Sequence, residues 1–208
     1  PPIKILLLNA GVQLPGKVEY TADGIERTFG INHVGHAMLF SLLQVYLADD
    51  VRIVATSSAT HDPAQKAGLP DAKYTTAEEL AHPSPGTSKN PGLQRYTSSK
   101  LVTVMWTYAL HRRLARLQGK KWTVIAFDPG MMPGTGLARD LQPIIRFLWF
   151  KVLPRAIPAL RLLLSPNIHT PQESAASLAW LATNTDLNGV SGVYYEGRRM
   201  IPSSVESY

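Results

Sequence analysis

The sequence of 208 residues contains no cysteine. Disulfide bonds, thiolate metal sites and a cysteine nucleophile are therefore excluded. The sequence also has no apolar run of about 20 residues, the length that a membrane-spanning helix requires. A chain of this size in which 45% of the residues are hydrophobic can bury a substantial core. We expect one globular domain, and the lack of cysteine fits a cytoplasmic location.

Acidic residues are scarce relative to basic ones. Asp and Glu number 15 against 21 Lys and Arg, which gives a net charge of +6 at pH 7 and a pI near 9.6. The basic residues do not alternate with aromatic residues in the manner of a nucleic-acid-binding module. The charge pattern favours a solvated basic face, and we expect no nucleic-acid partner.

Strands alternate with helices along the chain. Short apolar runs that stop at turn residues predict parallel strands at 3–8, 51–56, 122–127 and 193–195. Apolar residues at helical spacing and helix start and stop signals predict helices at about 25–47, 96–118 and 171–182. The first and last of these helices are preceded by capping-box spacing, at Asp23 to Glu26 and at Thr170 to Glu173. Residues 59–95 are rich in Pro, Gly, Ser and Thr, which predicts a long insert.

Tyr96 and Lys100 stand four residues apart in one of the expected helices. Residues at this spacing share a helix face, about 6 Å from each other. A nearby ammonium favours the phenolate, so Lys100 should lower the pKa of Tyr96 toward the range useful for exchanging a proton with an alcohol or carbonyl oxygen. The pair alone is weak evidence, because a sequence with 8 Tyr can contain this spacing by chance.

Four further motifs accompany this pair in a fixed order. They are Asn9-Ala10-Gly11 after the first strand, Asn32-His33-Val34-Gly35 in the next helix, Ser57-Ser58 after the second strand and Pro129-Gly130 after the third. Together with Tyr96-x-x-Ser99-Lys100, this order resembles that of the short-chain dehydrogenases/reductases over essentially the whole chain. The long insert and Thr135-Gly136-Leu137 look like the branch of retinol dehydrogenases and protochlorophyllide reductases.

The resemblance implies a role for each motif. Tyr96 would be the general acid or base for the substrate oxygen, and Lys100 would lower its pKa and hold the nicotinamide ribose. Ser58 would hold the same oxygen, and Asn32 would kink its helix and hold a water that links Lys100 to solvent. The implied cofactor contacts are Asn9, Ala10, Gly11, Asn32, Tyr96, Lys100, Pro129, Gly130, Met132 and Thr135. The resemblance favours NADP as the cofactor, and NAD is not excluded.

The implied fold is α/β, with a Rossmann-like doubly wound parallel sheet between two layers of helices. Residues 1–208 would form a single partial domain, from about the fourth strand of the family onward, with the insert at 59–95 and a substrate lid at 137–169. Members of the family begin with a glycine-rich turn that cradles the cofactor pyrophosphate. The spacing of Gly130 to Gly136 mimics this turn, but its position matches the family's nicotinamide loop. We therefore expect a fragment of a longer protein, truncated at both ends.

The expected lid is dominated by apolar residues, interrupted by Arg and Pro, between 143 and 166. Its place in the family suggests a lipophilic carbonyl or alcohol as the substrate, with His61 and Met131 as further contacts beside Ser58. The same apolar and basic surface could instead contact a membrane peripherally, or cover the core. Relatives often pair as homodimers through the helices that correspond to those at Asn32 and Tyr96.

Two classes of function follow from these observations. The first is an NAD(P)-dependent oxidoreductase that interconverts a carbonyl and an alcohol, or reduces a related double bond, on a lipophilic small molecule. The second is a truncated or inactive relative that acts as a binding or interaction module. The intact set of Asn32, Ser58, Tyr96 and Lys100 favours the enzyme, whereas the missing glycine turn favours the module. His33 and His36 could share a metal, but no suitably spaced Asp, Glu or Cys completes a ligand set, so we expect no metal site.

Overall fold

The computed structural model describes residues 1–117 and 119–208. One sheet contains five strands in chain order, β1 (Ile3–Leu8), β2 (Leu47–Thr56), β3 (Thr123–Asp128), β4 (Val193–Glu196) and β5 (Arg199–Ile201). The first four strands are parallel, and β5 is antiparallel to β4. Strand β1 forms one edge of the sheet, where the side chains of Ile5 and Leu7 are exposed.

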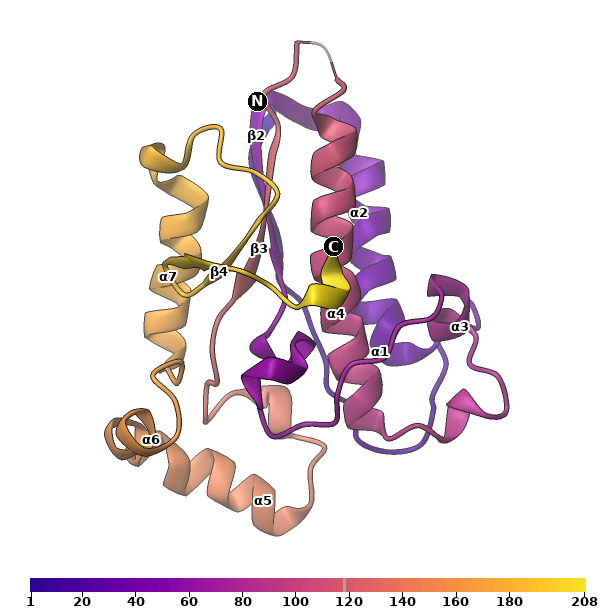
Figure 1. Ribbon diagram of the computed structural model, residues 1–208, viewed down its shortest axis with the longest axis vertical. Helices are drawn as coiled ribbons and strands as arrows, with labels where there is room; N and C mark the ends of the chain where they lie inside the picture. The colour runs from indigo at the N-terminus through magenta and orange to yellow at the C-terminus, as the bar shows by residue number, and fades with distance from the viewer. Residues whose placement is uncertain (118) are drawn as a thin grey trace.

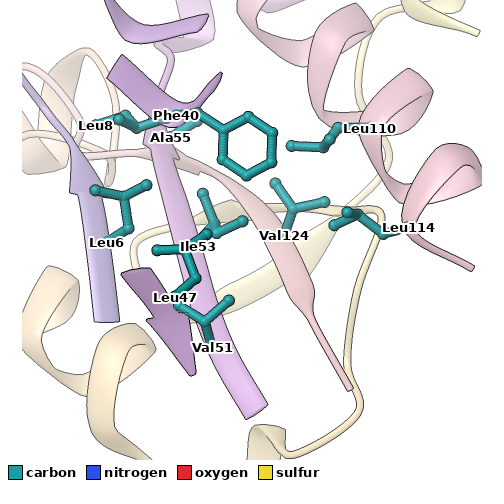
Figure 2. Close-up of a cluster of buried hydrophobic side chains, with 10 residues drawn as sticks. All are labelled: Leu6, Leu8, Phe40, Leu47, Val51, Ile53, Ala55, Leu110, Leu114 and Val124. Carbon is teal, nitrogen blue, oxygen red and sulfur yellow. The ribbon is translucent and has the colours of Figure 1, made fainter. Parts of the chain in front are cut away.

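Helices cover both faces of this sheet (Figure 1). On one face lie α2 (Gly35–Leu43) and α4 (Gly92–Leu114), and on the other lies α7 (Pro171–Thr183). Figure 2 shows the core of the first face, in which Phe40 of α2 and Leu110 of α4 meet strand side chains. A second cluster joins β2, β3 and β4 to α7 on the opposite face. Successive side chains of a strand point to opposite faces of the sheet, so the same strands contribute to both clusters. The predicted three-layer α/β fold is confirmed.

The first helical run begins later than the capping-box spacing predicts. It consists of α1 (Arg27–Phe29), a π-helical turn (Gly30–Val34), α2 and a 3₁₀ turn (Gln44–Tyr46). Asp23 is not its cap, because residues 21–24 form a turn that needs a positive φ at Gly24. Glu26 caps the helix instead, since its carboxylate accepts a hydrogen bond from the backbone N–H of Phe29 at 2.7 Å.

Other boundaries move because tertiary contacts extend the elements. Strand β2 begins at Leu47 rather than Val51, and α4 begins at Gly92 rather than Tyr96. A Cβ at Gly92 would lie 2.1 Å from the carbonyl oxygen of Leu14, so the start of α4 requires glycine. Helix α4 ends at Leu114, whereas the predicted end, Gln118, lies outside the described residues. Strand β5 was not predicted, because it is short and mostly exposed.

The predicted insert and lid contain short helices. The insert, residues 59–95, includes α3 (Ala77–Ala81) and 3₁₀ turns at Ala59–His61, Pro63–Gln65 and Thr87–Lys89. The lid, residues 137–169, includes α5 (Pro143–Phe147), a π-helical turn (Leu148–Val152), a 3₁₀ turn (Leu153–Arg155) and α6 (Ile157–Leu163). In Figure 1, α5 and α6 lie beyond the end of the sheet, apart from the other helices.

Candidate active site

The sequence motifs meet at the carboxyl ends of the parallel strands, where open α/β sheets usually place their ligands. Asn9 follows β1, and its side-chain oxygen accepts a hydrogen bond of 2.9 Å from the hydroxyl of Thr56 at the end of β2. The backbone N–H of Ser57 donates to the carbonyl oxygen of Phe127 in β3 at 2.7 Å. These bonds hold the ends of three strands together.

Tyr96 and Lys100 project from α4 into this region. Both side chains are buried, at 5% and 4% exposure. The Lys100 ammonium lies 5.7 Å from the centroid of the Tyr96 ring and donates a hydrogen bond of 2.9 Å to the carbonyl oxygen of Thr56. The predicted pair therefore shares one side of the helix, and its cation is fixed by the end of β2.

Burial dominates the proton equilibria of this pair. Loss of hydration raises the pKa of Tyr96 to about 12, with a smaller contribution from the negative charge of Asp128; a hydrogen bond from Ser58 opposes the shift. Loss of hydration also lowers the pKa of Lys100 to about 8. The expected lowering of the Tyr96 pKa is thus wrong for this structure, because the loss of hydration on burial sets the direction of the shift. At neutral pH Tyr96 is a protonated phenol.

Asn32 lies in the π-helical turn and is fully buried. Its side-chain oxygen accepts from the backbone N–H of Val12 at 2.8 Å. Its amide group donates to the carbonyl oxygen of Val12 and to the hydroxyl of Ser99, both at 3.0 Å. The side chain therefore joins the loop after β1, the π-helical turn and α4, while its role in holding a water stays a prediction.

The loop after β1 leaves space beside the Lys100 ammonium. Ala10 is exposed, and Gly11 follows it. A Cβ added to Gly11 would lie 3.5 Å from both the side-chain oxygen of Asn32 and the Lys100 ammonium. Any side chain longer than that of alanine would begin to fill the space next to the cation.

The turn after β3 is held by a buried carboxylate, that of Asp128. One of its oxygens accepts from the backbone N–H of Gly130 at 2.9 Å, and the other accepts from the side-chain amide of Asn167 at 2.7 Å. Gly130 has a φ of +76°, and a Cβ there would lie 2.5 Å from Asn167. Ser174 donates to the carbonyl oxygen of Pro129 at 2.6 Å. Sequence reasoning missed Asp128, although an acidic residue directly before Pro-Gly at a strand end was a signal.

The next residues of this loop are held by their backbones. Met131 exchanges two hydrogen bonds of 2.9 Å with residues 167–169, at the end of the lid. The hydroxyl of Thr135 donates to the carbonyl oxygen of Met132 at 2.9 Å. The segment Gly136–Ala138 is a single 3₁₀ turn rather than the start of an α-helix. This geometry argues against a phosphate cradle here, because such a cradle uses the N-terminus of a helix.

His61 occupies a structural position. The ring is buried, and its Nδ1 lies 2.7 Å from the carbonyl oxygen of Ser58. The Nε2 atom accepts a hydrogen bond from the backbone N–H of Ser204 at 3.1 Å, so Nδ1 carries the proton. Both ring nitrogens are thereby engaged within the protein, which leaves neither of them for a substrate.

His33 and His36 also have packing roles. His33 contacts the rings of Phe29 and Trp106, with centroids at 5.2 and 6.1 Å. Burial lowers the pKa of both histidines to about 4, so they are neutral at pH 7. Within residues 1–117 and 119–208, no group of three or more His, Asp or Glu side chains is arranged to hold a metal ion.

Comparison with known sequences identifies relatives over most of the chain, although no family model matches. A short-chain dehydrogenase, iccH, from Talaromyces variabilis is 30% identical, and the match covers 95% of this chain and 64% of that protein. Polyprenol dehydrogenase from Danio rerio is 31% identical, with coverage of 100% and 57%. Retinol dehydrogenase 14 from Mus musculus is 31% identical, with coverage of 94% and 51%. These homologues are short-chain dehydrogenases, and the chain is similar to them over nearly its whole length.

Solved structures show the same similarity at the level of the fold. An angucycline C-6 ketoreductase with bound NADP matches with a TM-score of 0.60 and 20% identity, over 95% of this chain and 63% of that one. The chain spans 51% to 64% of the length of the three curated relatives above. The predicted similarity to the retinol dehydrogenase branch is confirmed by these relatives.

Proposed function

We propose that the chain carries the proton-transfer site of an NAD(P)-dependent oxidoreductase that interconverts a carbonyl and an alcohol. The observation that supports this proposal is a buried, protonated Tyr96 within reach of the Ser58 hydroxyl and one helical turn from Lys100. A general acid must hold its proton until the substrate oxygen becomes basic. A pKa of about 12 meets this condition at neutral pH.

Each residue has a distinct task in carbonyl reduction. The Tyr96 hydroxyl donates its proton to the substrate oxygen as negative charge develops there, and the Ser58 hydroxyl donates a hydrogen bond to the same oxygen. With a pKa of about 8, Lys100 is mostly charged at pH 7. Its field stabilises the phenolate that Tyr96 becomes. Asn32 transfers no proton in this scheme; it holds the loop after β1 against α4.

The cofactor that we propose is NADP, with NAD as the alternative. The residues present fit a nicotinamide ribose, because Gly11 leaves space beside the Lys100 ammonium. Among the described residues, the carbonyl oxygen of Thr56 is the sole hydrogen-bond acceptor for that ammonium, so two of its three protons remain for ribose hydroxyls. Asn9 and Ala10 would line the same side, and the 129–135 loop would contact the carboxamide. When bound, the cofactor supplies or accepts a hydride.

The substrate that we propose is a lipophilic carbonyl or alcohol. Two of the relatives are named for polyprenol and retinol, both of which are lipophilic alcohols. Apolar side chains line the lid that follows the 129–135 loop, and Met131 is partly exposed at its start. A site with such a cover favours long apolar molecules over charged ones.

A matched pair of tyrosine variants tests the proposal. Tyr96→Phe removes the proposed acid, so turnover of NADPH with a retinoid or polyprenoid aldehyde should fall by about 100-fold or more. Tyr108→Phe is the control, because Tyr108 is also buried in α4 and burial raises its pKa to about 12. Its hydroxyl bonds Ser203 at 2.6 Å rather than Ser58, and turnover should persist.

The outcomes separate the two classes of function. Equal turnover of Tyr96→Phe and the unmodified protein would contradict the role of Tyr96. A folded protein that binds NADPH and turns over no aldehyde, alcohol or related compound with a reducible double bond would favour the alternative, a binding module without catalysis.

We also propose that the protein forms a homodimer through α2. Met38, Leu42 and Val45 are exposed and recur at helical spacing, which forms an unpartnered apolar stripe. Light scattering should report a dimer for the unmodified protein and a monomer for Leu42→Asp. A monomeric mass for the unmodified protein would contradict this proposal.

A further inference from the structure

After Asp140, the lid carries positive charge and no acidic residue. Between Leu141 and Gln172 the sequence contains Arg146, Lys151, Arg155 and Arg161 and no Asp or Glu. Arg161 forms an ion pair with Glu173. Within the part of the chain that the structure describes, the other three cations have no acidic group within 4.0 Å. The lid therefore presents uncompensated positive charge.

The same segment exposes large apolar side chains. Leu162 is 86% exposed and Ile144 is 77% exposed. Spacing of four residues places Ile144, Leu148 and Val152 on one face of the run formed by α5 and the π-helical turn after it. We call the whole set the lid surface: Ile144, Ile145, Phe147, Leu148, Val152, Leu162, Leu163, Leu164, Arg146, Lys151 and Arg155.

The lid surface is separate from the contacts that hold the lid to the protein. The indole N–H of Trp149 donates to the carbonyl oxygen of Thr135 at 3.0 Å, and the guanidinium of Arg161 donates to the carbonyl oxygen of Ile168 at 2.6 Å. Ala138, Ile157 and Ile168 are the buried apolar residues of the lid. The inward side thus fixes the lid, while the lid surface covers no core.

We propose that the lid surface docks on a membrane with anionic lipids. Exposed leucine and isoleucine side chains next to Lys and Arg are the composition of segments that lie in the interface, with apolar groups below the headgroups and cations beside the phosphates. Such docking requires no spanning helix, and none of the helices in residues 1–117 and 119–208 is both long and apolar enough to cross a bilayer.

Charge decides between a membrane and a second copy of the chain as the occupant. Two lid surfaces placed face to face would bring Arg146, Lys151 and Arg155 of each copy together, and like charges across an interface oppose association. An anionic lipid layer has the opposite charge and an apolar interior, so it accommodates both kinds of side chain. The observed composition therefore fits the lipid surface better.

The position of the lid means that docking would place the proton-transfer site near the membrane. In Figure 1, α5 and α6 lie at the end of the sheet toward which β2 and β3 run. The site lies at the same end, because the Lys100 ammonium donates to the carbonyl oxygen of Thr56 at the end of β2. Docking would therefore bring the site close to the lipid layer that stores lipophilic alcohols and carbonyls. This consequence rests on the proposed function, whereas the docking itself does not.

Vesicle sedimentation tests the role of the cations. The unmodified protein should bind vesicles of phosphatidylcholine and phosphatidylserine more tightly than vesicles of phosphatidylcholine alone. Each basic residue near an anionic surface contributes about fivefold to binding, so Arg146→Gln/Lys151→Gln/Arg155→Gln should weaken binding by about 100-fold. The control Arg112→Gln/Arg113→Gln/Arg116→Gln loses the same charge from the end of α4 and should retain most of the binding.

A second pair of variants tests the apolar part. Leu162→Gln/Leu164→Gln should lose binding, whereas Met200→Gln/Val205→Gln, which changes two exposed apolar residues elsewhere, should not. Thermal unfolding of each variant shows whether the fold is retained. Absence of vesicle binding by the unmodified protein, or equal losses in the lid and control variants, would overturn the proposal.

Docking and catalysis are separable in this design. Tyr96→Phe should bind vesicles as the unmodified protein does, because Tyr96 is buried away from the lid surface. Self-association that depends on Leu162 and Leu164, without vesicle binding, would assign the surface to a second copy and overturn the membrane proposal.

Discussion

The proton-transfer site and the lid surface are built on opposite principles. At the site, the side chains of Asn32 and Lys100 are buried, and each makes hydrogen bonds to groups from other elements. At the lid surface, leucine side chains are exposed and three cations have no acidic partner among the described residues. The comparison indicates that the polar site is organised within the chain, whereas the lid is arranged for contact with something outside it.

The largest effect should come from breaking a buried ion pair next to the site. Arg95 precedes Tyr96 and lies 3.2 Å from Glu26, and both side chains are buried. Arg95→Met would leave the Glu26 carboxylate unpaired, so the free energy of unfolding should fall by about 3 to 5 kcal/mol. Lys120→Met is the control, because it removes an exposed partner of Asp49 and should cost less than about 1 kcal/mol. Urea unfolding measures both variants. Equal losses of free energy of unfolding in Arg95→Met and Lys120→Met would contradict the predicted difference between the buried and the exposed ion pair.

Removing the buried cation of the site, Lys100, should raise the free energy of unfolding, in contrast to Arg95→Met. Lys100→Met should abolish turnover and raise the free energy of unfolding at pH 7. The pKa of Lys100 falls from 10.5 to about 8 on folding, and each unit corresponds to about 1.4 kcal/mol, so the gain should be at most about 3 kcal/mol. The lost hydrogen bond to Thr56 reduces it.

The pH dependence of this gain has a definite direction. Between pH 8 and 10.5 the unfolded chain binds more protons at Lys100 than the folded chain does, so the stability of the unmodified protein should rise with pH in that window. Below pH 8 Lys100 is charged in the folded protein, so burying its charge costs the full amount of stability. Denaturation of both proteins at pH 7 and near pH 10 checks this, and a gain that is the same at both pH values would count against a buried ammonium.

Asp128 should affect the proton equilibria more than the fold. Its negative charge raises the pKa of both Tyr96 and Lys100. Asp128→Asn should therefore shift the pH profile of turnover to lower pH while the carbonyl oxygen of the new amide still accepts from Gly130. Asp186→Asn, an exposed carboxylate outside the site, should leave the profile unchanged. A profile that does not move would remove Asp128 from the electrostatics of the site.

The smallest effect should come from the lid surface. Leu163→Gln should change the free energy of unfolding by no more than about 0.5 kcal/mol, because Leu163 is exposed. Ile157→Ala, on the inward side of the same helix, should cost about 2 kcal/mol or more. A large loss in Leu163→Gln would mean that the lid surface supports the fold, contrary to the comparison.

Local signals predicted those parts of the fold that local physics decides. The capping box at Thr170 and Glu173 is present as expected, because all of its groups lie within one helical turn. Asp23 does not cap the first helix as predicted, because residues 21–24 form a turn before the helix begins. The pairing of Asp128 with Asn167 joins residues 39 apart, and sequence spacing holds no trace of such a bond.

The pKa of Tyr96 shows the same limit at the site. Spacing to Lys100 predicted that the two side chains share a helix face, which depends on helix geometry alone. It could not predict the sign of the pKa shift, because that depends on how completely the assembled fold buries the phenol. Burial is a property of the assembled fold.

The central claim is that burial, rather than pairing with a carboxylate, sets the proton chemistry of the site. The ionisation of Lys100 tests it most directly. Its side-chain carbon signal can be followed by NMR against pH in protein labelled with carbon-13 lysine and assigned with Lys100→Arg. We expect a pKa of about 8. A value at or above the ordinary 10.5 would contradict the account.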